Sequence, residues 1–345
     1  MSPAIFTIVM SSLATGTIIT MTSHHWLLAW MGLEMNTLAI IPIISITHNP
    51  RATEAATKYF LTQAAASAMV LFASMTNAWQ TGTWDITSLS YMPSHILLTM
   101  ALAMKLGLAP MHFWLPEVLQ GTTLPTSLII TTWQKLAPMS LIYMTINSLS
   151  TMILISLGLL SSIIGGWGGL NQTQTRKIMA FSSIAHLGWM ITISSLMTNI
   201  MILNLTIYLI MTTAMFCSLI LSKSKTMQDI MMTWTISPTL TTLMMILLLS
   251  LGGLPPLTGF MPKWLILEEL VAQNLIPTAT IMAMSALLSL FFYLRLTYVT
   301  ALTLSPNTAQ TKFKWRLKPN SPKLFMMASS AMSMFLLPLT PLMLL

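Results

Sequence analysis

The chain has 345 residues, of which 55% are hydrophobic and only 6% charged, with a formal net charge of +8. About a quarter of the residues of a soluble domain are charged because its surface must be wetted, so we expect lipid to surround most of this chain. The basic residues are scattered over short loops without a dense basic face, which excludes nucleic acid as a partner. The single cysteine, Cys217, excludes an intramolecular disulfide and a cysteine-built metal cluster.

Apolar segments long enough to cross a hydrocarbon core, about 20 residues each, predict eleven transmembrane helices. The first has neither a basic flank nor a small-residue cleavage site, so we expect no cleavable targeting segment. The ninth is too long for one plain crossing. The predicted helices lie near residues 3–22, 25–46, 55–77, 95–115, 124–146, 150–170, 178–197, 199–221, 237–271, 276–300 and 325–344.

The charge of the loops predicts the orientation, since Lys and Arg stay on the side from which a chain is inserted. Loops after the second, sixth, eighth and tenth predicted helices carry basic residues, whereas loops after odd-numbered ones carry none. The N-terminus is therefore expected on the positive side and the C-terminus on the opposite side. The basic residues concerned are Arg51, Lys58, Arg176, Lys177, Lys223, Lys225, Lys312, Lys314, Arg316, Lys318 and Lys323.

An internal repeat joins residues 107–116 (GLAPMHFWLP) to residues 253–262 (GLPPLTGFMP), which agree at the glycine, the leucine and both prolines. The copies lie five crossings apart, in the fourth and ninth predicted helices, so the two units would be inverted relative to each other. Inverted repeats with Gly/Pro-broken helices are typical of transporters. A common helix-ending pattern is the alternative explanation. The repeat predicts non-helical backbone near Ala109–His112 and Leu254–Gly259.

The predicted fold class is thus an all-α polytopic membrane protein built from two inverted five-helix repeats with broken helices 4 and 9. We expect the first repeat over residues 1–148 and the second over residues 149–305. A basic loop and a C-terminal transmembrane helix complete the chain over residues 306–345.

Four charged residues, Glu34, Lys105, Lys135 and Lys263, fall at mid-membrane depth, where an ionised side chain costs at least about 2.5–3.5 kcal/mol. One glutamate can form at most one simple pair with three lysines, so the others need water, a carbonyl of a broken helix, or an altered proton affinity. Because buried lysines can exchange protons near neutrality, a proton relay is the favoured interpretation. The alternative is that the charges only hold helices together. A kink at Pro138 would also account for Lys135.

Two histidines lie at the same depth. His112 falls inside the first predicted break and is a relay candidate. His186, central in the seventh helix, could bridge neighbouring lysines or bond to a serine across a helix interface. Glu54 and Lys58 are four residues apart and predict an ordinary surface ion pair.

Other chemistries find little support in the sequence. The glycine-rich residues 165–169 lack the lysine and the strand that a phosphate site requires, so they predict close helix packing. No histidine pair at helical spacing faces a carboxylate, so we expect neither a metal nor a haem site.

Several strings resemble the antiporter-like subunits in the membrane arm of respiratory NADH:ubiquinone oxidoreductase, complex I. The resemblance runs from about residue 20 to residue 300, and the last loop and the C-terminal helix match only in character. The strings are residues 30–36 (WMGLEMN), 50–56 (PRATEAA), 105–117 (KLGLAPMHFWLPE), 133–138 (WQKLAP), 167–174 (WGGLNQTQ) and 251–264 (LGGLPPLTGFMPKW).

The resemblance implies a proton-translocating core subunit that couples electron transfer from NADH to ubiquinone to proton pumping. Glu34 would pair with Lys105, Lys135 would continue a polar axis, and Lys263 would lie on its far side. FMN, iron–sulfur clusters and ubiquinone would belong to other subunits. The expected location is the mitochondrial inner membrane, N-terminus in the matrix and C-terminus in the intermembrane space. Expected partners are other membrane-arm subunits, including the neighbouring antiporter-like one, and lipid, with cardiolipin as a candidate.

The chain departs from the family pattern in two ways. It looks three helices shorter at its N-terminus than the fourteen-helix bacterial relatives, which puts in doubt a lateral seal or a path that those helices provide. The repeat aligns Lys263 with Glu117, so Lys105 has no counterpart in the second half and equivalent half-channels are not expected. A cation/proton antiporter carrying sodium and a structural spacer are the alternative functions, although one carboxylate among three lysines disfavours sodium.

Overall fold

The structure is a computed structural model that describes residues 2–302 and 323–341. The described residues form helices and no β-strand, which confirms the all-α prediction. They divide into two compact units: unit 1 is Met1–Ser161 with Ser194–Thr198, and unit 2 is Ser162–Ile193 with Asn199–Leu345. The inverted relation of the two repeats stays a prediction. The basic residues Lys312, Lys314, Arg316 and Lys318 lie outside the described residues.

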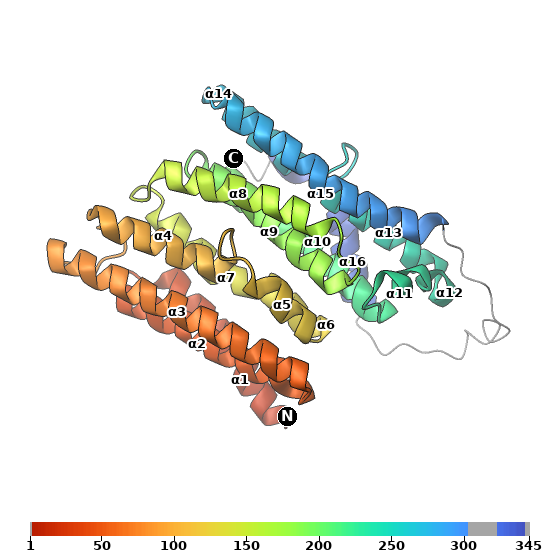
Figure 1. Cartoon of the computed structure of the whole chain (residues 1–345), viewed down its shortest axis with the longest axis horizontal. Coiled ribbons are helices and arrows are strands. Elements are labelled where there is room, and N and C mark those ends of the chain that lie inside the picture. The colour runs from red at the N-terminus through yellow and green to blue at the C-terminus, as the bar shows by residue number, and fades with distance from the viewer. Residues whose placement is uncertain (1, 303–322, 342–345) are drawn as a thin grey trace. The chain divides into compact units, whose positions relative to one another are not determined.

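Unit 1 is built on three long helices that lie side by side at the red and orange end of the chain (Figure 1). Two of them begin with proline at the first helical position, where the missing N–H is not needed. α1 also packs on α7, and α3 packs on α4 and α5. The helices are α1 (Pro3–Thr22), α2 (Trp26–Ile44) with the short η1 (Ser45–Thr47), α3 (Pro50–Thr81), α4 (Met92–Leu106), α5 (Trp114–Gly121), α6 (Leu124–Thr131), α7 (Trp133–Thr145) and the first part of α8 (Thr151–Gly169).

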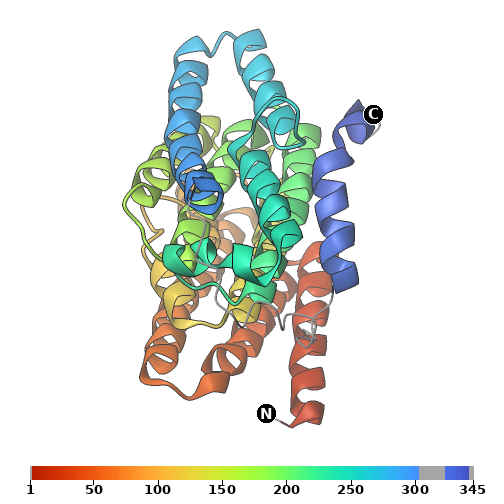
Figure 2. The ribbon, with the colours of Figure 1, turned by 90° about the vertical axis from the view of Figure 1, so that its right-hand side faces the viewer.

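Unit 2 holds the rest of α8 and the remaining helices. α13 contacts both α15 and α16 (Figure 2), and α14 packs on α15. The helices are α9 (Thr175–Ser194), α10 (Thr198–Ser222), α11 (Met227–Met231), α12 (Thr233–Ile236), α13 (Pro238–Gly252), α14 (Phe260–Ala272), α15 (Ile276–Leu302), α16 (Lys323–Phe335) and the short η3 (Leu337–Leu339).

Both predicted helix breaks are confirmed. α4 stops before Gly107 (φ 76°, ψ 39°) and α13 stops before Gly253 (φ 80°, ψ 47°), both in the left-handed region. The second residue after each helix donates its N–H back over five residues, at 2.9 Å in the first break and 3.3 Å in the second. This is the same glycine-dependent helix end in both units. It leaves the last carbonyls of each helix available to other donors.

The predicted helix over 124–146 is two helices, and the interruption lies at Thr132 (φ −109°, ψ −70°) rather than at Pro138. Pro138 lies inside α7. The hydroxyls of Thr131 and Thr132 donate to carbonyls four residues earlier, at 3.0 and 2.7 Å. Such bonds back to the preceding turn bend helices. The interruption of the helix therefore lies six residues before Pro138, the position that the alternative explanation of Lys135 had invoked.

The remaining differences have local causes. α11 and α12 are too short to produce a helical period in the sequence. α16 ends at Phe335, well before the predicted residue 344, because Pro338 disfavours helix for the residue before it and has no N–H. By length and composition, six of the described helices could each cross a membrane unbroken. The breaks shorten others, such as α4 and α13.

Loop pairing follows the predicted alternation. In unit 1 the loops after the first and third crossings bond to each other, through Trp26 N–H to the Trp84 carbonyl (3.1 Å) and Ile86 N–H to the His24 carbonyl (3.0 Å). In unit 2 the basic loops after the sixth and eighth crossings pair through Thr175 N–H and the Lys225 carbonyl (3.1 Å). Loops separated by two crossings must lie on the same side of a bundle, as these do.

Candidate functional site

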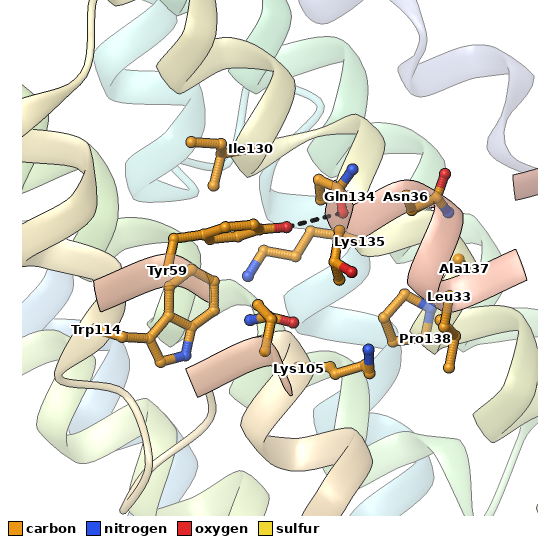
Figure 3. Close-up of a pocket in the computed structure, with 12 residues that line it drawn as sticks. Leu33, Asn36, Tyr59, Lys105, Trp114, Ile130, Gln134, Lys135, Ala137 and Pro138 are labelled. Atoms are coloured by element: carbon orange, nitrogen blue, oxygen red, sulfur yellow. Dashed lines mark hydrogen bonds between the residues drawn. The ribbon is translucent and has the colours of Figure 1, made fainter. Parts of the chain in front are cut away.

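A small cavity in unit 1 brings two of the predicted relay lysines together (Figure 3). Lys105 from α4 and Lys135 from α7 both line it, with exposed fractions of 4% and 1%. Every helix from α2 to α7 contributes to its wall. The lining residues are Leu33, Asn36, Thr37, Tyr59, Gln63, Lys105, Trp114, Ile130, Gln134, Lys135, Ala137 and Pro138.

Lys135 is held by the end of the broken helix. Its Nζ donates to the carbonyl of Leu106, the residue just before the left-handed Gly107, and lies 5.7 Å from the centre of the Trp114 ring. The carboxyl end of a helix carries partial negative charge and unpaired carbonyls, and an aromatic face also attracts a cation. These contacts confirm that a buried lysine here uses a carbonyl of a broken helix in place of a carboxylate.

Lys105 and Glu34 do not form a direct ion pair. In the described part of the chain the ion pairs are those of Lys58, and the Lys105 amine is buried without a hydrogen-bond partner. The carboxylate of Glu34 accepts a bond from the Thr37 hydroxyl at 3.1 Å instead. Glu34 nevertheless lies near enough to Lys105 and to Tyr59 for its charge to act on both.

Unit 2 has a similar arrangement at its own break. Lys263 Nζ donates to the carbonyl of Gly252 at 2.9 Å, and Gly252 directly precedes the left-handed Gly253. The His186 ring bonds to the backbone of Leu251, one residue earlier, and lies 5.6 Å from the Tyr208 ring. The carboxyl end of α13 thus collects the lysine and the histidine that the sequence placed at mid-membrane depth.

In each break a lysine binds the carbonyl of the residue before the left-handed glycine, but the two lysines come from different places in their units. Lys135 comes from α7, 29 residues away from its acceptor, whereas Lys263 comes from α14, just past its own break. This difference agrees with the expectation that the two halves are not equivalent half-channels.

His112 lies in the unit 1 break, where it is 5% exposed, and its ring sits 4.3 Å from the Phe113 ring. The side chain interacts with the backbone of Pro110. His112 is not among the residues that line the unit 1 cavity.

The sequence analysis missed the polar side chains that complete the cavity wall. The Tyr59 hydroxyl donates to Gln134 Oε1 at 3.4 Å, and Gln63 lies one turn after Tyr59 on α3. Asn36 lies two residues after Glu34 on α2. Amide side chains within apolar spans, one of them adjacent to Lys135, are the signal that could have found them.

The predicted surface pair of Glu54 and Lys58 is confirmed, with an N–O distance of 2.6 Å. Lys58 also pairs with Glu117 at 2.6 Å, so it ties α3 to α5 directly after the first break. Because all three side chains are about half exposed, water screens both pairs and each contributes little to stability.

Known proteins share this fold and this sequence. The profile of the NADH:quinone oxidoreductase/Mrp antiporter transmembrane family matches residues 23–289, and that of the NADH dehydrogenase subunit 2 C-terminus matches residues 290–344. NADH-ubiquinone oxidoreductase chain 2 of Varanus melinus is 58% identical over 341 residues, covering 99% of each chain. The same chain of Xenopus laevis is 56% identical over 342 residues, again with 99% of each covered.

Solved structures agree. A chain of respiratory complex I from Thermus thermophilus superimposes with a TM-score of 0.88 at 25% identity, covering 99% of this chain and 79% of the bacterial one. A chain of the Mrp complex from Dietzia sp. shares the fold, with a TM-score of 0.82 at 16% identity, covering 96% and 74%. The family profiles together match residues 23–344, and the relatives match nearly the full length. The chain therefore belongs to the family of NADH-ubiquinone oxidoreductase chain 2, among the antiporter-like membrane subunits.

Proposed function

We propose that this chain is a proton-translocating subunit of respiratory NADH:ubiquinone oxidoreductase, in which Glu34, Lys105, Lys135 and Lys263 pass protons. Membership in the family supports this role, as does the fold shared with a chain of the Thermus complex. Electron transfer through FMN, iron–sulfur clusters and ubiquinone takes place in other subunits. No group of side chains that could hold a metal occurs among the described residues.

The observation that carries the proposal is the placing of buried lysine amines on the carbonyl ends of broken helices. Lys135 and Lys263 each donate to the carbonyl before a left-handed glycine. A helix end offers only partial negative charge, so it stabilises an ammonium group without binding its proton as a carboxylate would. Such a lysine keeps its place in both protonation states, which is what a relay group must do.

The membrane potential sets the energy that moving a proton through this chain requires. Moving one charge against 100 mV takes about 2.3 kcal/mol. Two unit charges 4 Å apart interact by about 4 kcal/mol at an effective dielectric constant near 20. Glu34 and Lys105 lie farther apart than a direct ion pair, so their interaction is weaker than this, and neutralising Glu34 favours release of the proton from Lys105. In unit 1 the proton path runs from Glu34 through Lys105 to Lys135; in unit 2 it uses Lys263 and His186, and His112 is a further relay candidate at the first break.

We place the chain in the mitochondrial inner membrane with its N-terminus in the matrix and its C-terminus in the intermembrane space. The same-side pairing of the basic loops in unit 2 supports this orientation. Its partners are other membrane-arm subunits, including the neighbouring antiporter-like one, and the lipid bilayer.

The test is proton flux through the assembled complex in sealed membranes, measured with and without sodium. Lys135→Met should remove the flux that passes through this subunit while electron carriers remain intact, and Lys58→Met, which removes a half-exposed lysine, is the matched control. Flux that requires sodium would support the antiporter alternative. Full flux in an assembled Lys135→Met complex would support the structural spacer.

A further inference from the structure

Trp114 is fixed against the end of the first broken helix. Its indole N–H donates to the carbonyl of Met104 at 3.1 Å, and Met104 lies in the last turn of α4. The ring also packs on the left-handed Gly107, where an added Cβ would lie 3.3 Å from Trp114 Cζ2. Trp114 is only 7% exposed. A hydrogen bond and close packing therefore hold the ring in one orientation.

The ring of Trp114 lies beside the amine of Lys135 (Figure 3). Lys135 Nζ is 5.7 Å from the ring centre and donates to the carbonyl of Leu106, two residues after Met104. A cation within about 6 Å of a tryptophan face is attracted to it, most strongly where water is excluded. Lys135 is buried. The amine thus has two partners, a helix-end carbonyl and the ring that is bound to the same helix end.

The end of α4 offers more than one carbonyl to a lysine. Lys135 comes from another helix on a flexible four-carbon side chain, so its own chain does not determine which carbonyl it binds. The Met104 carbonyl accepts the N–H of Gly107 at 3.1 Å as well as the indole N–H of Trp114. A carbonyl oxygen has two lone pairs, so the indole takes the one that the lysine would otherwise find open. The carbonyl of Leu106 is left for the amine.

The second break has a different residue at the position of Trp114. In the internal repeat this position is taken by Phe260, which has no side-chain N–H and whose ring stacks on Trp264 with centres 6.4 Å apart. Lys263 follows Phe260 by three residues on the same helix, α14, and its amine binds the Gly252 carbonyl at 2.9 Å. Chain connectivity places that lysine near its acceptor. The indole is thus found in the break whose lysine comes from a separate helix.

We propose that Trp114 is a positioning residue for Lys135. Its face holds the ammonium group, and its indole N–H occupies the Met104 carbonyl, so that the amine is directed to the carbonyl of Leu106. The proposal rests on the proposed function, in which Lys135 passes protons. Trp114 itself takes up no proton. Its contribution is to keep the amine at one acceptor, because proton transfer requires donor and acceptor within hydrogen-bond reach.

The experiment measures proton flux per assembled complex in sealed membranes for Trp114→Leu and Trp114→Phe, with a density map of each. The reference is the share of the flux that Lys135→Met removes. Trp114→Leu loses the aromatic face and the N–H and should lose most of that share. Trp114→Phe should lose a smaller part, because a phenylalanine face attracts a cation less than a tryptophan face does.

The maps report the position of the amine. In Trp114→Leu the Lys135 amine should leave the Leu106 carbonyl, and in Trp114→Phe it should be divided between the carbonyls of Leu106 and Met104. Phe260→Leu is the matched control, because it removes the aromatic ring at the equivalent position of the second break. Its flux per assembled complex should be unchanged.

Several outcomes overturn the inference. Full flux per assembled Trp114→Leu complex does so, as does a Lys135 amine that stays on the Leu106 carbonyl in both variants. If Trp114→Leu does not assemble, full flux in Trp114→Phe decides against it. If the variants lose assembly and nothing else, or if Phe260→Leu loses as much flux, Trp114 is a packing residue and the inference fails. If Lys135→Met also pumps fully, the proposed function itself fails; if only the Trp114 variants do, the positioning role alone is refuted.

Discussion

Replacing Lys105 with Met removes the charge while keeping an unbranched side chain of similar length. Under a purely structural role, deleting one member of a buried ion pair costs about 3–5 kcal/mol. The structure predicts a smaller loss because no direct pair exists: the Lys105 amine has no partner in the described chain, and Glu34 keeps its 3.1 Å bond from Thr37. Lys105 is only 4% exposed, so its removal also relieves a desolvation penalty of several kcal/mol.

We therefore expect stability to fall by no more than about 1 kcal/mol, within the range of ordinary substitutions, and the complex to assemble at nearly normal levels. Proton flux should fall, either as fewer protons per electron or as slower NADH turnover when the two are tightly coupled. The assay measures the amount of assembled complex, NADH oxidation and proton uptake in the same sealed membranes. Loss of the assembled complex with normal specific flux in what remains would refute the reasoning.

Three further predictions concern the helix breaks and a loop. Gly259→Ala should prevent assembly, because its Cβ would lie 1.8 Å from a backbone oxygen of α13. Gly82→Ala has open space around it and a φ of 72°, so it should cost only about 1–2 kcal/mol. The fraction of assembled complex is measured for both variants. Thr258→Val should increase the mobility of the second break, because the hydroxyl of Thr258 donates to a carbonyl near the end of α16. Amide exchange over residues 253–259 should become faster in this variant. Thr258→Ser keeps the hydroxyl and should restore protection from exchange. Burial raises the pKa of Asp229, but hydrogen bonds from two backbone N–H groups lower it by more than burial raises it. The pKa of Asp229 is therefore below its usual range. Asp229→Ala should therefore weaken the first turn of α11 by about 1 kcal/mol at neutral pH, and the difference from the unsubstituted chain should vanish as pH falls through the carboxyl pKa, in amide exchange over 225–231.

The bounds of the first apolar helix and both helix breaks could be predicted from the sequence. Apolar length sets where a crossing begins and ends, so α1 was predicted residue for residue. The breaks followed from glycines and prolines, whose backbone preferences are local. The position of four charges in apolar segments likewise needs only counting along the chain.

What each charge touches was decided by the tertiary structure. Counting along the apolar segment places Lys135 near its middle but does not tell which carbonyl the lysine binds. That acceptor is the carbonyl of Leu106, 29 residues earlier. The expected pair of Glu34 and Lys105 gave way to a bond between Glu34 and Thr37, its own neighbour on α2. Residues of six helices line the cavity. Their polar side chains form a site only because the folded chain brings them to one place. Convergence depends on how helices rotate and pack against one another, which a pattern along a single chain does not specify.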